Sequence, residues 1–208
     1  ANIWGIVSHA SWAFAMLHSK RWSFGNYADK VKSGNVKEMA ELVKSQLDSS
    51  FDVKTLEWVR SLWPGKLIVK GILDVEDANM AVAAGADAIL ISNHGGRQLD
   101  SAPSTASVIS GIVDAVGEKT EVYVDSGVRS GLDVLKFLGL GARACFIGRA
   151  YLYGLGAYGQ AGVTKALEIL KDELSVAMAL TGVTDVAKVP RDIILRGPPA
   201  PEIGRASC

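Results

Sequence analysis

The residues best suited to chemistry lie in one short polar string, residues 92–100, which directly follows the apolar run 88–91. His94 can exchange a proton near neutral pH, and Arg97 can hold a carboxylate through two parallel hydrogen bonds. The glycines between them let the backbone approach a ligand closely. A solvated surface loop is the alternative interpretation for a single histidine, but the assembled string is far more specific. We therefore expect an acid–base and anion-binding site here.

Polar residues also follow three other apolar runs. Lys70 ends the first run, residues 125–131 follow the third, and Gly148 with Arg149 follows the fourth. Glycines expose backbone N–H groups, a helix N-terminus adds positive charge, and Arg129 and Arg149 complete what looks like a phosphate cradle. Two ordinary turns with solvated arginines are the alternative. Lys70 is either a structural residue or a positive charge beside an electron-rich cofactor.

The elements that must position these residues are repeated strand–helix units. We predict strands over residues 66–70, 88–92, 121–124 and 144–147. We predict helices over residues 35–47, 53–62, 74–85, 104–116, 130–140 and 163–181. Strand followed by helix at this spacing indicates a parallel sheet with right-handed crossovers. In a barrel of such units the carboxyl ends of the strands meet at one face, which is where active sites lie.

The predicted fold class is therefore α/β, a (β/α)8 TIM-barrel type of which only the C-terminal half is present, as about four βα units. A full barrel needs eight units and about 250 residues, whereas this chain has 208. We predict that residues 1–32 form an irregular lid or loop segment and residues 33–187 the half-barrel. Residues 188–208 are rich in Pro, Gly and Arg and are predicted to be a flexible tail.

Composition narrows the class of protein further. Lys and Arg together number 22, as do Asp and Glu, and this balance argues against a nucleic-acid partner. The two cysteines, Cys145 and Cys208, make neither a disulfide framework nor a metal cluster, so we predict no metal and a reducing, cytoplasmic location.

An apolar stretch with two tryptophans occupies residues 3–17. It is shorter than the ~18 apolar residues that a membrane span needs. We favour a helix that covers the barrel, or a loop deprived of its neighbour, and leave peripheral contact with a membrane surface as the alternative.

Four segments together resemble the FMN-dependent α-hydroxy acid oxidase/dehydrogenase family, which includes glycolate oxidase, lactate oxidase, mandelate dehydrogenase and the yeast flavocytochrome lactate dehydrogenase. The string Ser92-Asn93-His94-Gly95-Gly96-Arg97-Gln98-Leu99-Asp100 looks like the active-site segment of that family. Residues 67–71, 125–129 and 148–154 match its flavin segments. The resemblance covers about residues 20–187 and is highly specific, because all four segments occur in order.

The resemblance implies a role for each matching residue. His94 is implied as the catalytic base and a substrate contact, and Arg97 as the holder of the substrate carboxylate. The implied FMN contacts are Lys70, Ser92, Asp125, Ser126, Gly127, Val128, Arg129, Gly148 and Arg149. The implied reaction is oxidation of a small (S)-2-hydroxy acid, of the lactate, glycolate or mandelate type, to the 2-oxo acid.

One departure from the family pattern affects the function. The first half of the family supplies early barrel strands, tyrosines that touch substrate and an aspartate that orients the histidine, and residues 1–66 contain no counterpart. The alternative function is therefore a truncated, catalytically idle half-barrel that binds FMN or phosphate or self-associates. We expect a homo-oligomer or completion by a missing N-terminal half. A different phosphate-binding barrel, such as a type 2 isopentenyl-diphosphate isomerase, would not need the His94–Arg97 pair.

Overall fold

The computed structural model describes residues 8–18 and 36–195 of the chain. It divides into two compact units, residues 1–51 and residues 52–208, so the boundary lies later than the predicted one at residue 32. The first unit contains α2 (Ala10–Leu17) and α3 (Val36–Ser45). Part of the segment predicted to be irregular is thus helical, and the rest of it lies outside the described residues.

The side chains of α2 are largely exposed. Trp12, Phe14 and Leu17 are apolar and exposed to solvent on this short helix. Among the helices of residues 8–18 and 36–195, none is both long and apolar enough to cross a membrane.

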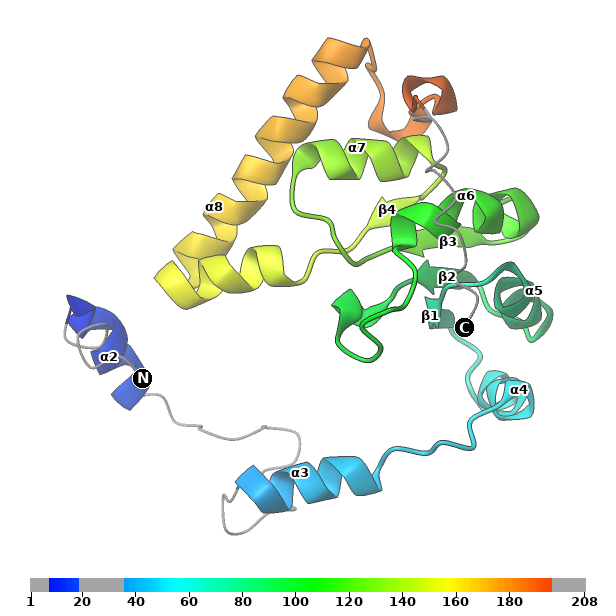
Figure 1. The fold of residues 1–208 in the computed structure, drawn as a ribbon, viewed down its shortest axis with the longest axis horizontal. Coiled ribbons are helices and arrows are strands. Elements are labelled where there is room, and N and C mark those ends of the chain that lie inside the picture. The colour runs from blue at the N-terminus through cyan, green and yellow to red at the C-terminus, as the bar shows by residue number, and fades with distance from the viewer. Residues whose placement is uncertain (1–7, 19–35, 196–208) are drawn as a thin grey trace, which may run out of the picture. The chain divides into compact units, whose positions relative to one another are not determined.

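The second unit is built on a parallel sheet that has four strands within the described residues, in the order β1-β2-β3-β4 (Figure 1). The strands are β1 (Ile68–Ile72), β2 (Ala88–Ile91), β3 (Glu121–Val124) and β4 (Ala144–Cys145). The helices are α4 (Val53–Leu62), α5 (Val75–Ala83), α6 (Thr105–Val116), α7 (Gly131–Gly139) and α8 (Arg149–Thr181). Short 3-10 turns are η2 (His94–Gly96), η3 (Val186–Lys188) and η4 (Arg191–Ile193). The prediction of an α/β chain with about four βα units is confirmed.

Side-chain caps fix where the crossover helices begin. The side chains of Asp74, Ser104 and Ser130 accept hydrogen bonds from backbone N–H groups in the first turns of α5, α6 and α7. Ser130 and Asp133 form a complete capping box. The segments between strand and helix differ in length: residues 73–74 precede α5, residues 125–130 precede α7, and residues 92–104 precede α6.

The core lies between the sheet and its crossover helices. Side chains alternate across a strand, so one face of the sheet receives β-branched residues that pack against α5, α6 and α7. The strand members of this core are Ile89, Ile91, Val122 and Val124, and the helix members include Ala78, Ala81, Ile109, Ile112, Val116 and Phe137. The opposite face carries the alternate residues, Lys70 and Leu90 among them.

Two strands differ from the sequence prediction. β1 lies two residues further along the chain than predicted, because Gly71 takes a positive φ of 98° and forms a bulge that lets the strand continue to Ile72. β4 ends at Cys145, although the Phe146 N–H still donates to the Val124 carbonyl.

The last helix begins much earlier than predicted. α8 starts at Arg149 rather than near residue 163, and it breaks at Tyr158 and Gly159, so that it forms two limbs (Figure 1). The limbs approach so closely at Gly154 and Gly162 that a Cβ atom on either would overlap the carbonyl oxygen of the other. Glycine has a low helix propensity, so these residues argued against a helix in the sequence. In the structure they allow the two backbones to pack against each other.

The segment predicted to be a flexible tail is packed over its described part. Val189 and Ile193 contact a small core of Leu135, Ala177 and Val183, and the Arg191 guanidinium forms an ion pair with Asp114 at 2.5 Å. Residues 188–195 thus contact the helices of the second unit, and residues 196–208 lie outside the described residues, so the flexibility of the tail stays a prediction. The apolar residues Val189 and Ile193 had no periodic pattern that could reveal this packing.

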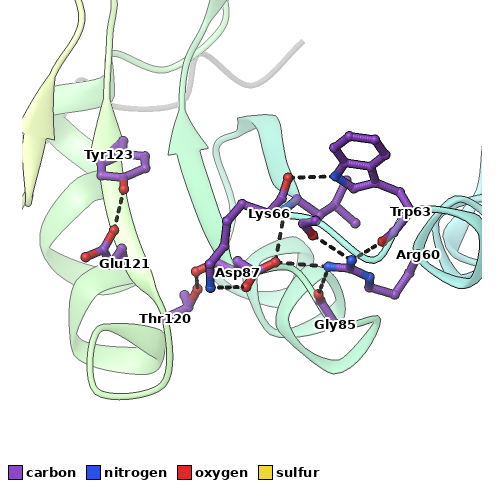
Figure 2. A network of polar contacts seen from close by, with 10 residues as sticks. Arg60, Trp63, Lys66, Gly85, Asp87, Thr120, Glu121 and Tyr123 are labelled. Atoms are coloured by element: carbon purple, nitrogen blue, oxygen red, sulfur yellow. Dashed lines mark hydrogen bonds and ion pairs between the residues drawn. The ribbon is translucent and has the colours of Figure 1, made fainter.

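A polar network closes the amino end of the sheet (Figure 2). The Asp87 carboxylate accepts hydrogen bonds from Arg60 Nη1 at 2.9 Å, Lys66 Nζ at 2.7 Å and the Leu67 N–H at 2.9 Å. The hydrogen bond from Lys66, followed by that from Leu67, lowers the pKa of Asp87 from 3.8 to about 2. This network ties α4 and the start of β1 to the start of β2.

Acid should therefore weaken the fold through Asp87. The lowered pKa means that Asp87 stabilises the folded state above its unfolded pKa of 3.8, and that this contribution disappears as the pH falls to about 2. We expect Asp87→Asn to lower the free energy of unfolding at neutral pH and to flatten its fall between these pH values, measured by urea unfolding. Glu57→Gln, which removes an exposed acid from α4, is the control and should keep the wild-type slope. An unchanged slope in Asp87→Asn would contradict the assignment.

Candidate functional site

The carboxyl ends of the four strands surround one cleft of about 280 Å³. Every one of the predicted residues Lys70, His94, Arg97, Arg129 and Arg149 lines it. Asp125, Ser126, Gly127, Val128 and Gly148 line it too, together with residues that the sequence analysis did not single out, such as Phe146 and Leu152. These five residues come from four strand ends that are far apart in the sequence, and the parallel sheet brings them together.

Lys70 lies at the bulge that Gly71 makes in β1, and its ammonium group is held by two neighbouring strand ends. Its Nζ donates to Ser92 Oγ at 2.7 Å and forms an ion pair with Asp125 Oδ2 at 3.0 Å. Ser92 is fully buried directly after β2. A bulge beside a site commonly redirects one side chain, and here it directs Lys70 toward the loop that follows β3.

The Asp125 carboxylate stays ionised although it is partly buried. Burial raises its pKa, but hydrogen bonds from Ser126, Ser92 and Lys70 together outweigh this effect and lower it. Its negative charge in turn compensates the ammonium of Lys70. The Asp125 carboxylate, with its hydrogen bonds from Ser126, Ser92 and Lys70, thus joins the carboxyl ends of β1, β2 and β3.

His94 occupies a strained backbone position. Its φ is +56°, a left-handed conformation that is uncommon for residues other than glycine. The His94 N–H donates to Ser92 Oγ at 3.1 Å, and its ring faces Gly71, where a Cβ atom would lie only 3.1 Å from His94 Cε1. Among the described residues, no side chain hydrogen-bonds the His94 ring. The geometry leaves the ring nitrogens available to the cleft.

Arg149 and α8 supply the anion-binding features of the cleft. Arg149 Nη2 donates to the Gly95 carbonyl at 3.2 Å, so the guanidinium lies beside the His94 loop. Gly148 is the N-cap of α8 and no side chain caps it, which leaves the first N–H groups of this helix for an anion.

The N-terminus of α7, by contrast, is already occupied. The Asp133 carboxylate accepts from the Arg129 and Ser130 N–H groups, and Glu173 of α8 accepts from the Gly131 N–H at 2.8 Å. Of the two helix N-termini beside the predicted phosphate cradle, that of α8 is the one that the described side chains leave open.

Cys145 lies at the end of β4 and is partly buried. Burial, and then the nearby charge of Asp133, raises the pKa of its thiol to about 12. The thiol is neutral at physiological pH, and a neutral thiol is a poor nucleophile.

Comparison with known proteins gives a family match over residues 1–196, to the FMN-dependent dehydrogenases. The chain belongs to the FMN-dependent dehydrogenase family. The identification made from the four sequence segments is confirmed, and so is FMN as the cofactor of the family.

Curated relatives within the FMN-dependent dehydrogenase family include L-lactate dehydrogenases. That of Chromohalobacter salexigens is 43% identical over 201 residues, which are 96% of this chain and 51% of that protein. That of Caulobacter vibrioides is 46% identical over 188 residues, 88% of this chain and 49% of that protein. The chain spans about half the length of the curated relatives it matches.

Solved structures of the FMN-dependent dehydrogenase family also match. A crystal structure of (S)-mandelate dehydrogenase, described as a monotopic membrane protein, has a TM-score of 0.81 at 40% identity, and the match covers 88% of this chain and 48% of that one. A soluble mutant of the membrane-associated (S)-mandelate dehydrogenase from Pseudomonas putida has a TM-score of 0.68 at 43% identity, with coverages of 76% and 46%. These neighbours are TIM-barrel flavoenzymes, so the four-stranded sheet corresponds to part of a barrel.

Substitution of Gly71 should disturb His94 specifically. We expect Gly71→Ala to cost about 1–2 kcal/mol of stability, because alanine is strained at positive φ, and to shift the NMR signals of the His94 ring. Gly85→Ala is the matched control. It has a similar φ of 89°, but its added Cβ would meet the Arg60 side chain, at the opposite end of the sheet from His94. Both variants should lose stability in urea unfolding, but only Gly71→Ala should shift the His94 signals. Unshifted His94 signals in Gly71→Ala would contradict the close approach of the ring to Gly71.

Proposed function

We propose that the protein acts in the FMN-dependent oxidation of a small (S)-2-hydroxy acid to the 2-oxo acid, with His94 as the base. The observation that carries the proposal is the cleft at the carboxyl ends of the strands, which gathers Lys70, His94, Arg97, Arg129 and Arg149. Three arginines around one histidine, beside the Lys70–Asp125 ion pair, suit two anionic ligands, a phosphate and a carboxylate.

The residues present fit FMN. The uncapped N-terminus of α8, with Arg129 and Arg149, supplies donors for a phosphate. A Cβ atom added at Gly127 or Gly148 would meet nothing within 4 Å, so the backbone leaves open space at the cleft there. Lys70, Ser92 and the segment from Asp125 to Val128 would hold the remainder of the cofactor. When bound, FMN supplies an acceptor for the two electrons that leave the substrate.

The chain's own residues would manage the substrate and its proton. The Arg97 guanidinium would hold the carboxylate with two hydrogen bonds, and this fixes the position of the 2-hydroxy carbon. His94 would take up one proton from the substrate at a ring nitrogen, which the described residues leave without a partner. The positive charge of Lys70 would favour an electron-rich group next to it.

The substrate class is proposed from relatives that are named L-lactate dehydrogenase and (S)-mandelate dehydrogenase. We propose the same class here, a small 2-hydroxy carboxylate.

An idle half-barrel is the second candidate function. The sheet ends at β1 and β4 within the described residues, and the His94 ring has no carboxylate partner there to orient it. Such a chain would bind FMN or phosphate, or associate with itself, without turning over. Under this alternative, turnover would require a partner subunit or a complementary half that supplies further strands.

A peripheral membrane position, in a protein otherwise in the cytoplasm, is proposed for the first unit. The support is the exposure of the apolar side chains Trp12, Phe14 and Leu17 on α2 and the membrane association of a relative. We expect the chain to sediment with lipid vesicles and a Trp12→Ser, Phe14→Ser variant to stay in the supernatant. Equal sedimentation of the two would favour α2 as a cover for the barrel.

The His94→Gln variant tests the proposed chemistry. With FMN and L-lactate, glycolate or (S)-mandelate under anaerobic conditions, we expect the yellow colour of the wild-type mixture to bleach. His94→Gln should slow bleaching by about 100-fold or more, because a general base is lost, while FMN binding measured by fluorescence stays within about twofold. If the wild-type chain binds flavin but none of the three 2-hydroxy acids bleaches it, the result would favour the idle half-barrel.

The companion variant Arg97→Met separates substrate holding from proton removal. It should raise the substrate concentration needed for half-maximal bleaching and leave FMN affinity unchanged. Arg143→Met, next to the amino end of β4, removes an exposed arginine that pairs with Glu121 and is the charge-matched control. Equal loss of FMN affinity in Arg97→Met would assign Arg97 to the cofactor instead.

A further inference from the structure

A buried threonine stands behind the loop that carries His94. Thr105 is the first residue of α6, is only 2% exposed, and is one of two buried polar residues in the described part of the second unit, the other being Ser92. Its hydroxyl donates to the Ser126 carbonyl at 3.1 Å. A threonine at the start of a helix usually acts as a cap, but here Ser104 is already the cap and Thr105 bonds to a different element.

The carbonyl that Thr105 holds belongs to a strained residue. Ser126 has a φ of +68°, and together with His94 it is one of the two non-glycine residues at positive φ in the described chain. Such a conformation costs about 1–3 kcal/mol and persists only when neighbouring interactions enforce it. Among the described residues, the Thr105 hydroxyl is the only donor to the Ser126 carbonyl.

The strained conformation determines where the Ser126 hydroxyl lies. Ser126 Oγ accepts from the Gly95 N–H at 3.1 Å and donates to Asp125 Oδ1 at 2.6 Å. Gly95 follows His94 directly, so this pair of bonds joins the loop after β3 to the loop that carries the histidine. Rotation of Ser126 to an ordinary negative φ would withdraw its hydroxyl from both partners.

We propose that Thr105 is a positioning residue: by anchoring the Ser126 carbonyl, it keeps the Ser126 hydroxyl on the Gly95 N–H and thereby fixes the backbone beside His94. Thr105 touches neither the substrate nor the cofactor in this account. The alternative is that Thr105 is a core residue whose hydroxyl only stabilises the fold.

Thr120 offers a matched control at the other end of β3. Its hydroxyl also donates to a backbone carbonyl, that of Asp87, at 2.8 Å, and it lies in the amino-end network (Figure 2). Thr105→Val and Thr120→Val remove the same chemical group from the same kind of hydrogen bond. Only the first should change the site.

The first measurement needs no cofactor: amide hydrogen exchange at Gly95, followed by NMR. We expect Thr105→Val to speed exchange at Gly95 about tenfold, the factor for one lost buried hydrogen bond. Thr105→Ser, which keeps the hydroxyl, should restore exchange to within about twofold of wild type, and Thr120→Val should leave it unchanged. Gly95 also donates to Asn93 Oδ1 at 3.0 Å, so part of its protection survives in every variant.

The second measurement rests on the proposed function and uses FMN. Thr105→Val and Ser126→Ala should each weaken FMN binding about tenfold, because both disconnect the same hydroxyl. The double variant should also lose about tenfold rather than about a hundredfold, since the two residues act in one chain of contacts.

The outcomes separate cleanly. Unchanged Gly95 exchange in Thr105→Val, equal acceleration in Thr120→Val, or additive losses of FMN affinity would each overturn the positioning role and leave Thr105 as a core residue. A wild-type chain that takes up no FMN would refute the proposed function, while Gly95 exchange would still decide the inference. If Thr105→Val does not fold, Thr105→Cys replaces it, with a weaker donor and an expected intermediate acceleration.

Discussion

The arrangement of the site depends on the Asp125 carboxylate. It accepts from Lys70, Ser92 and Ser126, which belong to three successive strand ends, and so converts three separate loops into one connected group. Each hydroxyl in this group has a defined direction: Ser92 and Ser126 donate to Asp125 and accept from the N–H groups of His94 and Gly95 respectively. Because a partly buried carboxylate is costly without partners, the loops are stable in this arrangement and in few others.

At the carboxyl end of the sheet, the residues with strained backbone are also the residues held by hydrogen bonds. His94 and Ser126 both occupy left-handed conformations that glycine would adopt at no cost, yet both positions carry side chains. The hydrogen bonds to their backbones and hydroxyls offset the strain, so the loops are held by contacts rather than by local preference. Such preorganisation suits a site that must keep a base and several donors in place before a ligand arrives. At Gly71 a glycine serves a different purpose, because it permits the close approach of the His94 ring.

The sequence was sufficient for the elements and for the location of the cleft, because both follow from patterns of short range. Apolar runs bounded by Gly and capping residues marked the strands and helices, and the parallel topology then required the polar ends to converge. The sequence could not reveal the first limb of α8, where Gly154 serves packing between two limbs, nor the packing of Ile193 on a distant core. It also could not indicate that Glu173 occupies the N-terminus of α7, since that contact joins residues 42 positions apart. Long-range contacts of this kind leave no periodic trace.

The amino end of the sheet stabilises the fold, whereas the carboxyl end forms the candidate site. At the amino end, Asp87 gathers Arg60 and Lys66 around relaxed backbone, and its strongly lowered pKa reflects attraction that favours the folded state. At the carboxyl end, three arginines line one cleft, and their mutual repulsion disfavours the folded state until anions enter. A ligand that carries negative charge would relieve this repulsion, so phosphate or FMN should stabilise the carboxyl end far more than the amino end. Stability supplied at one end thus permits a strained and positively charged site at the other.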